Sequence, residues 1–91
     1  MEITYKIIYL DEVRTKQIPN LPKTVKTLIK EAIDERLTKD PIAFGKPLRF
    51  NLKGYRRLRV SDYRIVYWID DEQKQVKIFA IKHRKDVYEE N

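Results

Sequence analysis

The sequence contains no cysteine, only two glycines and four prolines, and no long apolar run. Without cysteine the chain can form neither disulfides nor cysteine-ligated zinc or iron–sulfur sites. No apolar stretch approaches the roughly 20 residues of a membrane-spanning helix, and the first residues lack the apolar core of a signal peptide. We therefore expect a cytoplasmic protein with no metal, no other cofactor and no membrane partner.

Positive charge is concentrated in the second half of the chain. The net charge of +6 divides into eight Lys/Arg against seven Asp/Glu in residues 1–44 and twelve against seven in residues 45–91. Between Lys46 and Arg64 there are seven cations and one anion, Asp62. Such a block of one sign is typical of proteins that bind phosphate backbones, with a solvated charged surface as the alternative.

The 91 residues are enough for one domain, which we expect to span residues 1–91. Alternating apolar residues predict a first strand over residues 3–9. Asp11 is suited to cap a short helix to about Gln17, which the following Ile18-Pro19 would end.

A longer amphipathic helix is predicted next. Asn20 is its expected cap, Pro22 lies in its first turn, and Asp40-Pro41 stops it. Its apolar stripe has the spacing of a helix that packs on a core: Val25, Leu28, Ile29, Ala32, Ile33 and Leu37.

The second half of the chain predicts three strands, over residues 55–60, 63–69 and 75–82, after a connector at 41–54 that contains both glycines. Residues 84–90 predict a short terminal helix. The order β-α-α-β-β-β indicates an α+β fold, an antiparallel-rich sheet with two N-terminal helices packed on one face. The other face would be open for a ligand.

Arginines dominate this predicted open face. Side chains alternate along a strand, so Arg57 and Arg59 point away from the apolar residues between them. A hairpin turn after this strand would bring Arg64 across from them. Each guanidinium offers a planar fork of donors and a permanent charge, which suits phosphate. The alternative is that Arg64 is buried as an ion-pair partner of Asp62 or Glu12.

An aromatic residue and a histidine add to this face. Tyr55 can stack on a base of single-stranded nucleic acid. His83, the only histidine, titrates near neutral pH, although a structural hydrogen bond is its alternative role. RNA cleavage by attack of the 2′-hydroxyl needs a base, a cation for the transition state and an acid. The chain offers residues for all three: Arg57, Arg64 and Arg84 for the charge, His83 and Tyr88 for the protons.

Two motifs resemble those of a known family. Residues 54–67, GYRRLRVSDYRIVY, and residues 81–88, IKHRKDVY, resemble RelE toxins of the RelE/ParE toxin–antitoxin superfamily. The resemblance implies a compact α+β domain that cleaves messenger RNA in the A site of the 70S ribosome, without metal, and leaves a cyclic phosphate. It implies a RelB-like antitoxin that wraps the toxin, and operator DNA bound only through that complex, which represses its own operon.

The resemblance also assigns roles by position. Arg64 matches a family arginine that stabilises the transition state, and Arg84 and Tyr88 match the arginine and tyrosine of the C-terminal motif. Arg57 and Arg59 stand where founding members have a basic pair. The RNA-binding residues expected from charge and position are Lys46, Arg49, Lys53, Tyr55, Arg59, Lys82 and Lys85.

The chain departs from the family pattern at the general base. Founding members have a lysine in that strand, whereas Arg57 cannot act as a base because a guanidinium is not deprotonated in proteins. Other branches use a histidine at the place of His83, or a glutamate in the loop where this chain has Pro47-Leu48. His83 is therefore the predicted proton shuttle.

Two alternatives to a ribosome-dependent endoribonuclease stay open. A ParE-like toxin would bind DNA gyrase and catalyse nothing, but a pure binder needs no proton-transfer groups such as His83 and Tyr88. A homologue with weak or lost activity would act mainly with its antitoxin in operon repression.

Overall fold

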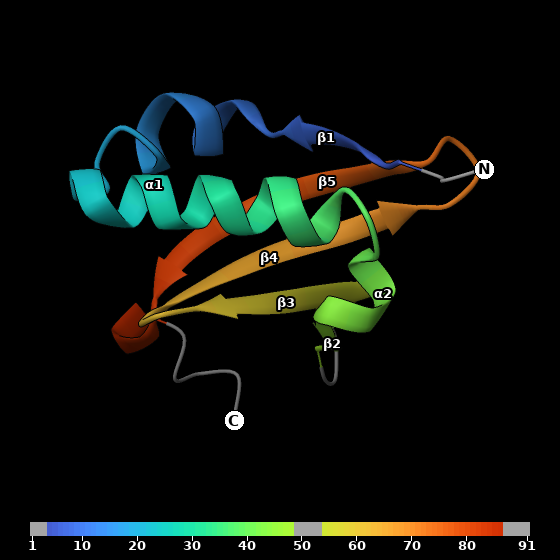
Figure 1. The fold of residues 1–91 in the computed structure, drawn as a ribbon. Helices are drawn as coiled ribbons and strands as arrows, with labels where there is room; N and C mark the ends of the chain where they lie inside the picture. The colour runs from blue at the N-terminus through green and yellow to red at the C-terminus, as the bar shows by residue number, and fades with distance from the viewer. Residues whose placement is uncertain (1–3, 49–53, 87–91) are drawn as a thin grey trace.

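A five-stranded sheet forms the centre of the computed structural model, which describes residues 4–48 and 54–86 (Figure 1). The strands are β1 (Lys6–Tyr9), β2 (Lys46–Pro47), β3 (Tyr55–Val60), β4 (Tyr63–Asp70) and β5 (Gln75–His83). Their order in the sheet is β1-β5-β4-β3-β2. β1 runs parallel to β5, and the other neighbouring pairs are antiparallel. The predicted α+β fold is confirmed.

Helical segments lie on one side of this sheet (Figure 1). They are η1 (Val13–Gln17) and α1 (Lys23–Ala32), which continues as η2 (Ile33–Leu37). The prediction that Asn20 caps the long helix is wrong. Pro22 occupies the cap position, and its carbonyl accepts the first helical hydrogen bond, from the backbone N–H of Lys26 at 2.8 Å. The extended ψ of Pro22, 148°, makes the turn there.

The connector predicted at residues 41–54 contains structure that the prediction missed. Pro41–Phe44 forms the short helix α2, and the carboxylate of Asp40 caps it by accepting a hydrogen bond from the backbone N–H of Ala43 at 3.1 Å. β2 then pairs with Arg56 and Arg57 of β3. A four-residue helix and a two-residue strand are too short to show a period in the sequence. Of the predicted terminal helix, the described residues contain one turn, η4 (Arg84–Asp86).

The apolar core lies between the sheet and the helices. Leu58, Ile65 and Ile81 are buried side by side on β3, β4 and β5. The other buried core residues are Val13, Ile29, Ala32, Ile33, Leu37, Tyr67, Val76 and Ile78. Leu28, predicted in the core stripe, is 49% exposed and lies at the margin of the helix face.

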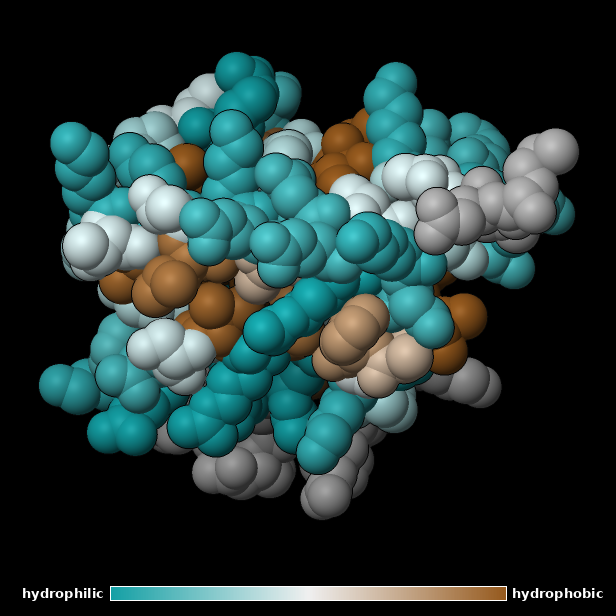
Figure 2. All heavy atoms as spheres, in the orientation of Figure 1, coloured by the Kyte–Doolittle hydropathy of each residue, from teal (hydrophilic) through white to brown (hydrophobic). Residues whose placement is uncertain are grey.

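The helix side of the molecule is mostly hydrophilic, with hydrophobic side chains showing beside α1 (Figure 2). Leu28, Ile42 and Phe44 are large apolar side chains about half exposed. Over the described part of the chain, no helix has the length and apolarity to cross a membrane.

Candidate nucleic-acid interface

The sheet face away from α1 carries a row of cations. Arg59 of β3 is opposite Arg64 of β4, and Lys82 of β5 is opposite Arg64 on its other side. The residues that alternate with them are buried toward the helices, so this row lies on the other face, as does Arg57. The alternation therefore places three predicted arginines together, with Arg64 at the centre.

These arginines line a pocket at the outer edge of β3, which we call the arginine pocket. Among the described residues, β2 pairs only with Arg56 and Arg57, so the rest of that edge carries no strand. The pocket has a volume of about 270 Å³ and is lined by Arg36, Phe44, Lys46, Arg57, Leu58, Arg59 and Arg64. Five of these lining residues are cations and none is a carboxylate. Such a set suits the oxygens of a phosphodiester.

The sequence did not reveal two wall residues of the pocket, Arg36 and Phe44. Arg36 lies in η2 and Phe44 in α2, far from β3 along the chain. Only the packing of these helical segments against the edge of the sheet brings them to the arginines. No local pattern encodes that contact.

Arg56 fixes this edge of the sheet from the side facing the helices. Its guanidinium donates hydrogen bonds to the carbonyl oxygens of Ile42 at 2.6 Å and Gly45 at 2.8 Å. The hydroxyl of buried Tyr67 donates to the carbonyl of Pro41 at 2.6 Å, and burial raises the pKa of this tyrosine. Together these bonds hold α2 and β2 against β3, which places Lys46 at the pocket.

The structure does not bring His83 into the arginine pocket. His83 is opposite Tyr63 in the sheet, and their rings meet edge to face with centroids 5.1 Å apart. Tyr63 packs against the core, so His83 lies on the helix side. Its Nδ1 accepts a hydrogen bond from the backbone N–H of Lys85 at 3.2 Å.

Of the remaining predicted site residues, some lie after the end of β5 and others lie outside the described residues. Arg84 is exposed beyond the end of β5, with a guanidinium nitrogen 3.8 Å from the carboxylate of Asp62. Lys85 is exposed in the same turn, η4. The described residues contain no group of three or more side chains that could hold a metal ion. Three predicted residues lie outside the described ranges: Arg49, Lys53 and Tyr88.

Aromatic side chains occupy the other end of the open face. Tyr55 is opposite Trp68, and its ring meets that of Phe79 edge to face with centroids 4.8 Å apart. The Lys77 ammonium lies 5.3 Å from the centre of the Trp68 ring. The face therefore changes along the strands from cationic to aromatic.

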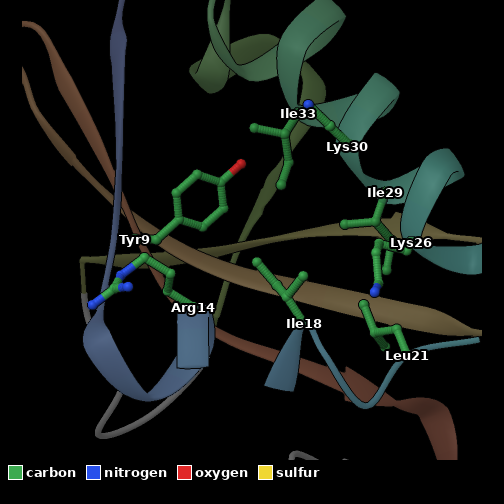
Figure 3. A pocket seen from close by; sticks show the side chains of 8 residues that line it. All are labelled: Tyr9, Arg14, Ile18, Leu21, Lys26, Ile29, Lys30 and Ile33. Carbon is green, nitrogen blue, oxygen red and sulfur yellow. The ribbon is translucent and has the colours of Figure 1, made fainter. Parts of the chain in front are cut away.

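A second cavity lies between η1 and α1 on the helix side, and we call it the helix groove (Figure 3). Its volume is about 430 Å³, and it is lined by Tyr9, Arg14, Ile18, Leu21, Lys26, Ile29, Lys30 and Ile33. Burial raises the pKa of Tyr9. Every charged side chain of the groove is a cation, while its other walls are mainly aliphatic. This chemistry suits an apolar segment that carries carboxylates.

Comparison with known proteins gives one consistent family. A family model described as "ParE toxin of type II toxin-antitoxin system, parDE" matches residues 9–88. The chain is 36% identical over 73 residues to Toxin RelG of Mycobacterium tuberculosis, covering 80% of this chain and 84% of that protein. It is 36% identical over 76 residues to Toxin RelE of the same organism, covering 84% and 78%.

Solved structures show the same likeness. A chain of the toxin–antitoxin complex RelBE2 from M. tuberculosis superposes with a TM-score of 0.84 at 31% identity, covering 92% of this chain and 95% of that one. A chain of the archaeal RelE–RelB complex from Pyrococcus horikoshii superposes with a TM-score of 0.70 at 28% identity, covering 89% and 96%.

Proposed function

The chain belongs to the RelE family of type II toxins, within the RelE/ParE superfamily, and from that premise we propose that it is a ribosome-dependent mRNA endoribonuclease. The observation that carries the proposal is the arginine pocket, with five cations and no carboxylate among its lining residues. In the proposed reaction, which needs no metal, the 2′-hydroxyl attacks its own phosphate. The 5′-oxygen leaves, and a cyclic phosphate remains. The toxin would act in the cytoplasm, at the A site of the 70S ribosome.

Charge stabilisation is the part of this reaction that the described residues support. Negative charge builds up on the phosphate oxygens in the transition state, and fixed donors aimed at it lower the barrier. Arg64 lies between Arg59 and Lys82 in the sheet, and its guanidinium keeps its charge at all working pH values. We assign it the central stabilising role. Arg57 lies beside it in the pocket, and exposed Arg84 is the additional cation that the proposal includes.

Proton transfer needs other groups, because arginine stays protonated at neutral pH and cannot act as a base. Tyr88 stays in the proposal as an acid or a stacking residue, on the basis of the C-terminal motif. His83, the residue that the sequence predicts as the proton shuttle, lies on the helix side of the sheet and not in the arginine pocket.

The proposal is tested with Arg64→Ala expressed in cells, with RNA ends mapped. The wild type is expected to arrest growth and cut messages inside translated codons. Loss of one transition-state donor typically costs about 100- to 1,000-fold in rate, so Arg64→Ala should relieve the arrest while staying folded. Arg14→Ala, which removes an exposed arginine of η1, is the control and should cut normally. A folded Arg64→Ala protein with wild-type cutting would refute the site.

A ParE-like inhibitor of DNA gyrase is the second candidate function, because the matching family model is described as ParE. The same cells distinguish the two. Supercoiling defects with intact messages would favour gyrase, and cuts inside codons would favour the endoribonuclease.

We also propose a RelB-like antitoxin as the partner, and an antitoxin complex as the form that binds operator DNA. Two relatives are solved as RelB complexes. The helix groove, aliphatic with a cationic rim, suits an amphipathic antitoxin segment that carries carboxylates. Charge complementarity of this kind governs both encounter and specificity.

The groove is tested by the double change Lys26→Glu/Lys30→Glu. The variant should lose copurification with the antitoxin encoded beside the gene but still cleave RNA. The control Lys16→Glu/Lys39→Glu alters net charge equally at exposed positions outside the groove. Equal antitoxin binding by both variants would remove the groove from the proposal.

A further inference from the structure

We propose that Tyr55, Trp68 and Phe79 form a base-stacking subsite for a nucleotide adjacent to the cleaved phosphate. This aromatic subsite deepens the proposed RNA cleavage and rests on it. Its ligand is a nucleobase of single-stranded RNA, which the rings hold by stacking on its face and not by recognising which base it is.

A β-bulge builds the subsite. Val66 pairs with Ala80, but the next residue of β4, Tyr67, pairs with Ile78. Phe79 is therefore the extra residue on β5, and the bulge allows its ring to share the open face. Its contact with Tyr55, at 4.8 Å between ring centroids, joins side chains from the two strands that flank β4. The two rings therefore meet over β4.

These rings have no role in the apolar core. Tyr55, Trp68 and Phe79 are each partly exposed and are not among the residues of the core cluster. An edge-to-face pair covers one face of one ring. The contact between Tyr55 and Phe79 therefore leaves their other ring faces uncovered by each other. α1 lies on the opposite side of the sheet (Figure 1).

The aromatic subsite is continuous with the arginine pocket. Tyr55 and Arg57 are two residues apart on the same face of β3, which is about 7 Å along a strand. A strand whose phosphate contacts the arginines therefore brings a neighbouring base to the rings. Lys77, 5.3 Å from the Trp68 ring centre, adds a cation beside them. A basic groove next to stacking rings is the usual arrangement for single-stranded nucleic acid.

Stacking would set which phosphodiester is cut. Every base has an aromatic face, so the rings accept any base and fix the strand along the sheet rather than select a sequence. The base held on the rings determines which phosphate reaches Arg64. The subsite therefore acts on the position of the cut, whereas the arginine pocket acts on its rate.

The single tryptophan of the chain provides the test. A short RNA with a 2′-deoxy sugar at the cleavage nucleotide cannot be cut and serves as the probe. It is titrated into the full-length protein, intact or with one abasic residue placed in turn at each position. We expect the intact probe to quench Trp68 fluorescence. One abasic position should weaken binding roughly 5- to 150-fold and abolish the quenching, as loss of one stacked base would.

Matched variants complete the design. Tyr55→Leu and Phe79→Leu keep apolar bulk and should bind intact and abasic probes equally, with cut positions in messages becoming less uniform. Tyr5→Leu changes a partly exposed tyrosine that lines neither the arginine pocket nor the helix groove, and it should behave as the wild type.

The possible results separate this inference from the proposed function. If the wild type cuts messages but binds every abasic probe as tightly as the intact one, the subsite is overturned and the endoribonuclease stands. If wild-type quenching depends on one base but messages stay intact, the subsite is supported and the proposed endoribonuclease activity is refuted. If Tyr55→Leu loses antitoxin binding but keeps the base dependence, the rings serve a protein partner and the inference is overturned.

Discussion

At the scale of single residues, His83 has two candidate roles: a proton shuttle and a structural residue. It is the only histidine of the chain, and histidine is the side chain that most often acts as a general acid or base. Its ring packs against Tyr63 on the helix side, whereas the arginine pocket opens at Arg59 and Arg64. A base must lie within hydrogen-bonding reach of the proton that it removes. The geometry therefore favours a structural role for this histidine.

We expect His83→Ala to lower the cleavage rate by less than about tenfold, because a general acid or base contributes about 100- to 10,000-fold when it acts. The shape of the pH–rate profile between about pH 5 and 8 should not change. The rate is measured by mapping RNA ends over this range, with Arg64→Ala as the impaired reference. A drop of 100-fold or more together with loss of one limb of the profile would restore His83 as the shuttle.

The sequence predicted some of these positions and not others for a definite physical reason. Arg57, Arg59 and Arg64 followed from the two-residue period of a strand, which holds wherever the strand is regular. The same period places His83 with Ile81 on the core side. His83 was assigned to the site because it is next to Arg84 in the sequence, although neighbouring residues of a strand point to opposite faces. Phe79 escaped prediction because a bulge breaks the period.

At the scale of elements, the edge formed by α2 and β2 is held by a few close contacts. Arg56 donates to the carbonyls of Ile42 and Gly45, and Tyr67 donates to that of Pro41. Gly45 is buried, and a Cβ at this position would come 1.7 Å from the Tyr67 hydroxyl oxygen. The segment therefore packs against β4 only because residue 45 has no side chain.

We expect Gly45→Ala to lower the free energy of unfolding by about 1–3 kcal/mol, the usual cost of overpacking a filled site. Cleavage should also fall, because a displaced β2 takes Lys46 away from the arginine pocket. Urea unfolding measures the first effect and mapped RNA ends the second. Lys39→Ala, at an exposed position nearby, is the control and should change stability by less than about 0.5 kcal/mol. A Gly45→Ala protein as stable as the control would contradict this packing.

The elements predicted from the sequence are those long enough to show a period. The amphipathic helix and the three C-terminal strands each extend over several repeats. α2 and β2 do not, and their prolines and Gly45 have the composition of a loop. The parallel pairing of β1 with β5 depends on contacts between the two ends of the chain, so no local pattern could reveal it.

At the scale of the whole molecule, the sheet separates two surfaces of different chemistry. The open face joins the arginine pocket to the aromatic subsite, and the helix side carries the groove proposed for the antitoxin. The fold class was predictable because the order of the longer elements allows few arrangements. The basic second half of the chain provides four of the five pocket cations, and Arg36 alone comes from the first half.

This charge distribution should make the proposed RNA binding dependent on salt. Each cation that neutralises a phosphate of a single strand releases counterions and contributes about −0.7 to the slope of log K against log salt concentration. With all five pocket cations engaged, the slope for the uncleavable RNA should approach about −3.5. Trp68 fluorescence between about 50 and 200 mM salt measures it. Arg59→Ala should make the slope shallower by about 0.7, while Lys39→Ala, an exposed lysine outside the pocket, should leave it unchanged. A slope near zero, or an equal effect of both variants, would mean that the arginine pocket does not hold the RNA backbone.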